Sequence, residues 1–546
     1  MTADAPDAGN ATMEKAPMAD KGVGIAAITG EGLAEHTKVL ASDEFEGRSP
    51  ASLGEERTVR YISEQFEKAG LEPGAEDSWF QSVPLVAITA HPGDNIRFEG
   101  NGKSQPLTFV EDVMVWTKRV VPGVELESSP LVFVGYGIVA PEYNWNDYEG
   151  LDVEGKTVVM LVNDPGFATG DPALFRGNAM TYYGRWTYKY EEAARQGAAG
   201  VIVVHETAAA GYPWEVVSGG WSGPSFDLIS ADRNLSRSAV EGWITQEAAI
   251  ELFANAGMDY AQMKKSAEQP GFKPVELPLS FSVSIENEVR ESLSHNVIGI
   301  LPGSTTPDEY VLYMGHWDHL GKDETREGDQ IFNGAVDNAT GVAALIELAG
   351  AFGSLPQGPD RSIIFMAVTA EESGLLGSRH YATDPLYPLN KTVAGINMDA
   401  LNVGGRTRDM VVVGFGSSEL EGMLETGAET QGREIVQEPT PEKGFFYRSD
   451  HFNLAKVGVP MLYAKGGIDS VEHGPEWGLE QARDYTANRY HKVTDEFDPD
   501  WDWSGTVEDV QLYFMVGTEV ARSGVWPEWF EGNEFRAIRE ASLAER

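Results

Sequence analysis

Hydrophobic residues recur at helical spacing near the start of the chain. Residues 32–40 and 54–69 both show this spacing, and in the second segment the apolar positions are Val59, Ile62 and Phe66. Such spacing predicts amphipathic helices whose apolar faces pack against a core. We therefore expect the globular part of the protein to begin near residue 25.

Between residues 129 and 281 the apolar residues gather instead in short runs. The runs include LVFVGYGIVA, TVVMLV and GVIVV, and the amphipathic segment Tyr188–Gln196 precedes the last of them. Short β-rich runs with an intervening helix are typical of a small mixed unit of strands and helices. We expect a separate, smaller β-rich domain over residues 129–281.

After Ser294, strands and helices alternate regularly to about residue 523. Strands are expected at residues 310–315, 362–368, 393–398 and 459–464, and an apolar helix at 342–352. This alternation predicts an α/β fold with a mostly parallel mixed sheet flanked by helices. In such sheets, functional groups gather beyond the carboxyl ends of the strands.

The remaining boundaries are drawn from composition. Residues 1–24 are rich in Ala, Asp and Pro without periodicity, so a flexible leader is expected there. Residues 25–128 are assigned to the first part of the main domain and 282–525 to its core. The charged residues 526–546 are expected to form a surface segment.

Charge and cysteine content narrow the possible functions. The formal net charge is 41 − 85 = −44, and a surface so acidic repels nucleic-acid backbones and anionic lipids. No window approaches 18 consecutive apolar residues, so no membrane-spanning segment is expected. The chain has no cysteine, which excludes disulfides, thiol nucleophiles and thiolate-bound zinc. Any metal must be held by nitrogen and oxygen.

Metal-capable residues stand just after successive predicted strands. These positions are His316 and Asp318, Asp337, Glu371 and Glu372, Asp399, and finally Tyr490 and His491. Taken singly, each has a structural alternative, such as a helix N-cap for Asp337 or a solvated turn for the two glutamates. Because all of them fall where the ends of parallel strands meet, we expect one cluster. Histidine and carboxylate together suit zinc in the absence of thiolates.

The order of these motifs resembles that of the co-catalytic di-zinc peptidases, a family that includes bacterial secreted aminopeptidases and glutamate carboxypeptidase. The matching blocks are HWD at 316–318, DNATG at 337–341, EE at 371–372, NMD at 397–399 and YHKVTDE at 490–496. Ser449–His451 (SDH) and the VGVPML at 457–462 also fit. Residues 36–85 look like the lead-in of exported members, and residues 129–281 look like an inserted protease-associated domain.

The resemblance implies a role for each residue. Asp337 would bridge two zinc ions, His316 and Asp399 would complete one site, and Glu372 and His491 the other. Glu371 would be the general base, Asp318 would accept the second ring N–H of His316, and Tyr490 would steady the oxyanion. Other divalent metals could substitute for zinc.

The implied activity is a zinc-dependent exopeptidase acting on peptides, with an aminopeptidase as the first expectation. Carboxypeptidase or dipeptidase activity is the main alternative, because specificity depends on the pocket and not on the fold. A catalytically inactive binding protein and a single-zinc glutaminyl cyclase are weaker alternatives, since all five ligands and Glu371 are present. The resemblance and the acidic composition also predict a periplasmic or extracellular location.

Overall fold

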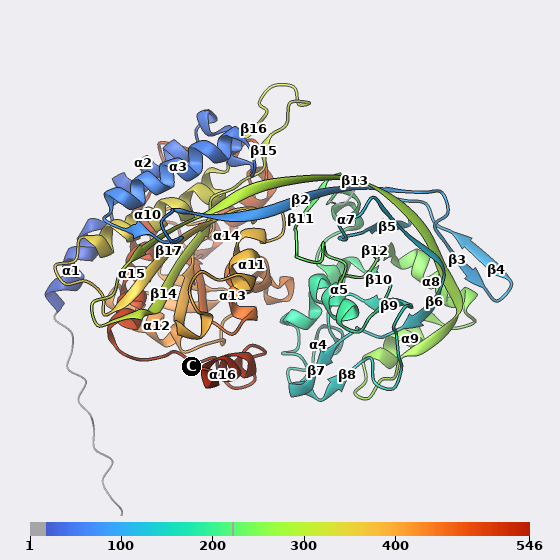
Figure 1. The fold of residues 1–546 in the computed structure, drawn as a ribbon. Coiled ribbons are helices and arrows are strands. Elements are labelled where there is room, and N and C mark those ends of the chain that lie inside the picture. Colours follow the sequence, from blue (N-terminus) through green and yellow to red (C-terminus); the bar gives the residue numbers. More distant parts are fainter. Residues whose placement is uncertain (1–17, 221–222) are drawn as a thin grey trace, which may run out of the picture.

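The computed structural model describes residues 18–220 and 223–546 and shows two lobes (Figure 1). A long antiparallel ribbon runs from one lobe to the other. It consists of β2 (Phe80–Pro92) and β13 (Val275–Leu301), paired from Phe80 opposite Val297 to Pro92 opposite Ile285. The chain therefore leaves the first lobe along β2 and returns to it along β13.

The first lobe is built on a mostly parallel sheet. Its strands lie in the order β13, β17 (Arg361–Val368), β14 (Thr306–His316), β18 (Thr392–Asn397), β21 (Met461–Gly466), β19 (Asp409–Val412) and β20 (Glu434–Gln437). The pairs β14–β17, β14–β18 and β18–β21 are parallel, whereas β13 and β19 each run antiparallel to a neighbour. This confirms the predicted α/β fold with a mostly parallel mixed sheet.

Helices cover both faces of this sheet. On β14, Val311 and Tyr313 belong to the core cluster shared with α2 (Gly30–Leu40), α3 (Leu53–Lys68), α10 (Thr340–Gly353) and α15 (Ser504–Arg522). The alternate residues Leu312 and Met314 belong to the cluster shared with α11 (Leu376–Thr383) and α13 (His451–Lys456). Both faces of the strand are thus buried, which explains why its sequence is apolar without alternation.

One helical stretch, Ala335–Gly353, is long and apolar enough to cross a bilayer. Within the protein, however, 89% of its most apolar window is buried, against the sheet and α2. Its hydrophobicity is therefore accounted for by its place in the core. In the described part of the chain, no other helix passes that test.

The second lobe contains a smaller mixed sheet. Its strands lie in the order β5 (Val113–Trp116), β12 (Val240–Thr245), β10 (Gly200–His205), β9 (Thr157–Leu161) and β6 (Gly123–Phe133), with β6 paired to β13. Two helices that pack on it are α5 (Trp186–Arg195) and α8 (Gln246–Asn255). Because β5 pairs with β12, this lobe begins before residue 129, where the sequence pattern placed its boundary.

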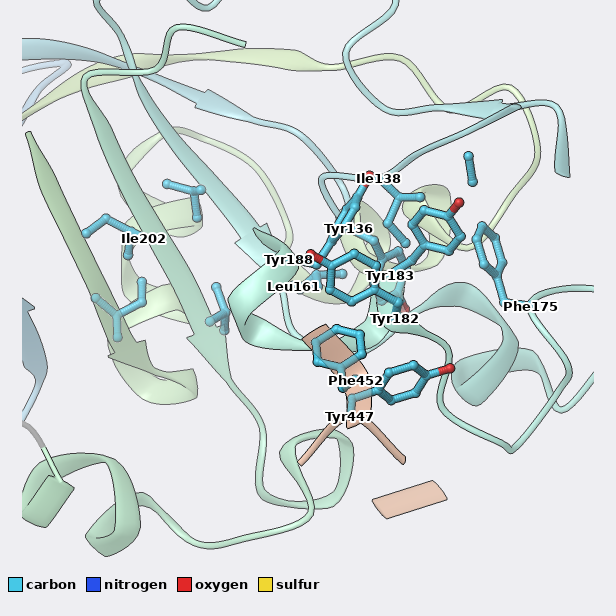
Figure 2. Packing of buried hydrophobic residues seen from close by; sticks show 14 of the residues in the cluster. Tyr136, Ile138, Leu161, Phe175, Tyr182, Tyr183, Tyr188, Ile202, Tyr447 and Phe452 are labelled. Atoms are coloured by element: carbon cyan, nitrogen blue, oxygen red, sulfur yellow. The ribbon is translucent and has the colours of Figure 1, made fainter. Parts of the chain in front are cut away.

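An aromatic cluster joins the two lobes (Figure 2). The ring of Tyr182, from the second lobe, lies 5.0 Å from that of Phe452, on α13 of the first lobe. Beside it, Lys456 Nζ is 2.8 Å from the Glu191 carboxylate. Buried aromatic area combined with an ion pair fixes the lobes against each other.

Both ends of the described chain are packed more closely than the sequence suggested. Of the expected flexible leader, residues 1–17 lie outside the described residues, and the rest enters α1 (Met18–Ala27). Gly24 lies against the Phe514 ring so closely that a Cβ atom there would overlap it. In the expected surface segment 526–546, Trp529 and Arg539 are buried, and Arg539 donates hydrogen bonds to the carbonyls of Leu389, Thr392 and Val393. That segment is therefore docked into the lobe through α16 (Arg536–Ala544).

Candidate metal centre

The predicted site residues meet at the carboxyl ends of three neighbouring parallel strands. His316 is the last residue of β14, Glu371 and Glu372 come after β17, and Asp399 comes after β18. Because β14 pairs with both β17 and β18, these side chains are brought to one edge of the sheet. His316 is almost completely buried there, at 1% exposure.

Asp337 lies between two histidines. Its Oδ1 is 3.2 Å from His316 Nε2, and its Oδ2 is 3.4 Å from His491 Nε2. Burial alone would raise the pKa of Asp337, but its contacts with these two rings hold the pKa well below the usual range. A carboxylate with each oxygen facing a different imidazole has the arrangement that a bridging ligand needs.

Each histidine also faces a second carboxylate. Asp399 Oδ1 is 3.7 Å from His316 Nε2, and Glu372 Oε2 is 2.9 Å from His491 Nε2. Burial opposes the charge on His491, yet Asp337 and Glu372 raise its pKa to about 10. All five predicted metal ligands are therefore brought together, as two groups that share Asp337.

Glu371 lies in the same cluster but in a different setting. It is grouped with His316 and Glu372, with one oxygen or nitrogen of each within 4.8 Å of the others. Burial and the neighbouring carboxylates of Glu372, Asp450 and Asp399 raise the pKa of Glu371 well above its ordinary value. A crowd of buried carboxylates of this kind favours the binding of cations.

Asp318 supports the glutamate pair instead of His316. Its Oδ1 accepts a hydrogen bond from the backbone N–H of Glu371 at 3.0 Å, and its Oδ2 accepts one from Glu372 at 3.4 Å. The expected contact with His316 is made by the Asp318 main-chain carbonyl, 3.1 Å from Nδ1, whereas the carboxylate is 3.8 Å away. The carboxylate is turned away because two amide donors compete for it.

Tyr490 is the predicted residue that the structure leaves most open. Its side chain is 45% exposed, and its ring stacks on that of His491 with centroids 3.9 Å apart. This contact can steady the His491 ring. The expected oxyanion role of Tyr490 stays a prediction.

The DNATG motif ties the bridging residue to the strand ends. Asn338 Nδ2 donates to the carbonyls of His316 and Met398, and Asn338 Oδ1 accepts from the amides of Gly341 and Ala400. A Cβ atom at Gly341 would lie 2.3 Å from Asn338 Oδ1, so only glycine fits there. Asn338 is therefore an organising residue that the sequence reasoning missed, although it lies within a recognised motif.

A buried arginine and a buried aspartate both form hydrogen bonds with the backbone of the loop before Asp337. Arg48 donates to the carbonyls of Trp317, Asn333 and Gly334, at 2.6–2.8 Å. Asp495 accepts from the amides of Val336 and Asp337. The arginine thus binds carbonyl groups of the loop, and the aspartate binds its amide groups. We call this pair of residues the Arg48–Asp495 clamp.

These two residues differ in how far sequence could have revealed them. Asp495 lies in the YHKVTDE block, four residues after His491, so the motif itself carried a signal. Arg48 lies in the lead-in segment, where a single arginine gives no hint of its partners. His319 was also missed, although it comes directly after Asp318. Its Nδ1 is 2.6 Å from Glu372 Oε1.

Comparison with known proteins shows which family this part of the chain resembles. Residues 296–515 match the model of peptidase family M28. Aminopeptidase NAALADL1 of Mus musculus is 37% identical over 138 residues, and a glutamate carboxypeptidase 2 homolog of Caenorhabditis elegans is 27% identical over 216.

The matched segments are short relative to those proteins. They cover 24% of this chain and 17% of the mouse protein, and 38% of this chain and 25% of the nematode protein. Among solved structures, an aminopeptidase from Aneurinibacillus sp. strain AM-1 is 19% identical, with a TM-score of 0.49, covering 93% of this chain and 97% of that one. The segment 296–515 contains every predicted ligand, and in this segment the chain is similar to peptidase family M28.

Proposed function

We propose that the protein is a zinc-dependent exopeptidase, and specifically an aminopeptidase. The observation that carries this proposal is Asp337, whose two oxygens face His316 and His491 in two ligand groups. A shared carboxylate between two nitrogen–oxygen groups is suited to a pair of divalent ions, and the chain offers no thiolate that would favour another kind of site.

The donor set fits zinc. His316, Asp337 and Asp399 would hold one ion, and Asp337, Glu372 and His491 the other, so each would have three protein ligands and an open position. When bound, two zinc ions would supply Lewis acidity to the scissile carbonyl and to the attacking water.

The transfer of the proton of the attacking water would then depend on side chains of the protein. Glu371 would take the proton of the attacking water on its carboxylate and pass it to the nitrogen of the leaving amine. Asp318 would keep Glu371 in place through the backbone N–H at 3.0 Å. The carboxylates at the site, with Asp399 partly exposed at 14%, would attract the ammonium group of a peptide N-terminus.

The first test combines metal content with a substrate panel. We expect two zinc ions per chain, loss of activity on chelation and its recovery when zinc is restored. Hydrolysis of aminoacyl-anilides but not of N-blocked peptides would support the aminopeptidase proposal. Hydrolysis of peptides with a C-terminal glutamate after N-blocking would favour the carboxypeptidase alternative, and full activity without metal would refute both.

We also propose that the protein is exported to the periplasm or outside the cell. The support is the lead-in at residues 36–85, which resembles that of exported members, together with a sequence pI near 4.5. Fractionation of cells that make the native gene product should find the protein outside the cytosol. Recovery of the mature protein from the cytosol alone would contradict this.

A further inference from the structure

His319 is a histidine at the site to which the proposed mechanism gives no role. It is buried, at 1% exposure, and its Nδ1 lies 2.6 Å from Glu372 Oε1. The other oxygen of that carboxylate, Oε2, is 2.9 Å from His491 Nε2. The two oxygens of Glu372 therefore have different partners, one on each side.

We infer that His319 is a positioning residue: its Nδ1–H binds Glu372 Oε1 and so leaves only Oε2 free to bind a metal. The inference rests on the proposed function, because it concerns the ion that Glu372 would share with Asp337 and His491. The consequence concerns the number of protein atoms that bind this ion. A glutamate limited to one oxygen keeps the three-ligand, open character that catalytic zinc sites have.

The surroundings of the ring fix this orientation. A Cβ atom at Gly334 would lie 2.5 Å from His319 Cγ, so the glycine makes room for the imidazole. The His319 backbone N–H donates to the Arg48 carbonyl at 3.3 Å, and the His491 ring lies 5.8 Å away. A ring packed so closely cannot turn without disturbing its neighbours.

The hydrogen-bond partners also indicate where the proton lies. His319 Nε2 is buried and has no hydrogen-bond partner in the described part of the chain. Buried N–H groups without a partner are rarer than buried lone pairs without one. The proton is therefore assigned to Nδ1, where the carboxylate accepts it.

A direct bond from His319 to the metal is the competing arrangement. One atom each of His319, Asp337 and Glu372 lie within 4.8 Å of one another, so these residues could themselves hold an ion. Binding of the ion through Nδ1 would break the 2.6 Å hydrogen bond, and binding through either ring nitrogen would give the ion four protein ligands, as in closed structural sites. The existing hydrogen bond favours the positioning role.

Three variants separate these possibilities. Asparagine can place an amide N–H near the position of Nδ1, glutamine reaches instead toward Nε2, and alanine offers neither. We expect His319→Ala and His319→Gln to weaken the binding of one of the two zinc ions about 10–100-fold, the usual effect of losing such a partner. His319→Asn should retain most of the affinity, and all three should still bind two ions at saturation.

The readouts are zinc affinity by chelator competition and the absorption spectrum of the cobalt-loaded protein, neither of which depends on turnover. The cobalt spectrum should change in His319→Ala, as Glu372 gains a second bond to the metal, and remain near wild type in His319→Asn. His91→Ala, at an exposed position on β2, serves as the control for removing a histidine, and thermal unfolding of the metal-free variants checks folding.

The possible results are distinct. If all three variants bind only one ion at saturation, His319 is a ligand and the inference is overturned. Unchanged affinity and spectrum in His319→Ala would also overturn it. If the unaltered protein binds two ions but hydrolyses no peptide, the proposed function fails while the inference can still be upheld. If it binds no metal, both fail.

Discussion

Replacement of Glu371 by glutamine should lower kcat by roughly 10²–10⁴-fold, the range typical of a positioned proton-transfer group. Glutamine has nearly the same shape as glutamate but cannot take a proton from water. Since Asp318 holds Glu371 through the backbone N–H, the substituted side chain should remain in place. Both metals should stay bound, and KM should change little.

The matched control is the adjacent Glu372→Gln. Glu372 is paired with two histidines, so its loss should lower metal occupancy as well as rate. Metal content by elemental analysis, measured beside turnover, distinguishes the two. If Glu371→Gln lost metal and Glu372→Gln kept it, the two roles would have to be exchanged, and unchanged turnover in both would favour the inactive-binding-protein alternative.

Asp337→Asn should have the largest effect on metal binding. The asparagine amide keeps one oxygen but replaces the other with an N–H₂ group, which cannot bind a cation. Since both ligand groups depend on Asp337, we expect the affinity for both ions to fall and activity to drop to background. Zinc titration of the metal-free protein measures both steps.

Asp399→Asn is the comparison for this variant. Two histidines face Asp337, and Asp399 lies near one of them, His316. Its loss should therefore weaken the binding of one ion and leave the other ion in place. If Asp337→Asn likewise lost a single ion, Asp337 would not be a bridge, and the assignment of a carboxylate shared by the two ions would have to be abandoned.

The sequence predicted the sheet and the cluster because both depend on local signals. Apolar runs such as residues 310–315 and 362–368 identify buried strands, and parallel strands place the residues after their carboxyl ends at one edge of the sheet. Three of the five blocks (HWD, EE and NMD) follow such strands, and together with the other two they were enough to predict that the site would assemble there.

Features that depend on distant partners could not be predicted in this way. The β2–β13 ribbon pairs residues about two hundred positions apart in the sequence, and neither segment carries a sequence signal that identifies its partner strand. The orientation of Asp318 was missed for a similar reason, because the amides of Glu371 and Glu372 compete with His316 for its carboxylate only in the folded chain. Charge and residue type indicated a role for Asp318 but not its partner.

The Arg48–Asp495 clamp has a consequence for how such proteins can be recombined. The family match covers residues 296–515, yet Arg48 lies far outside it and supplies hydrogen bonds to the loop before Asp337. Four backbone carbonyls receive those N–H groups, from Leu40, Trp317, Asn333 and Gly334. A chimaera that transplants only the motif-bearing stretch would deprive the Trp317 and Asn333 carbonyls of these N–H groups, while the Gly334 carbonyl would keep only the N–H of Ala339. The part of the chain that supports the site is therefore larger than the segment that the family model matches. A chimaera needs the lead-in at residues 36–85 together with the metal-binding segment.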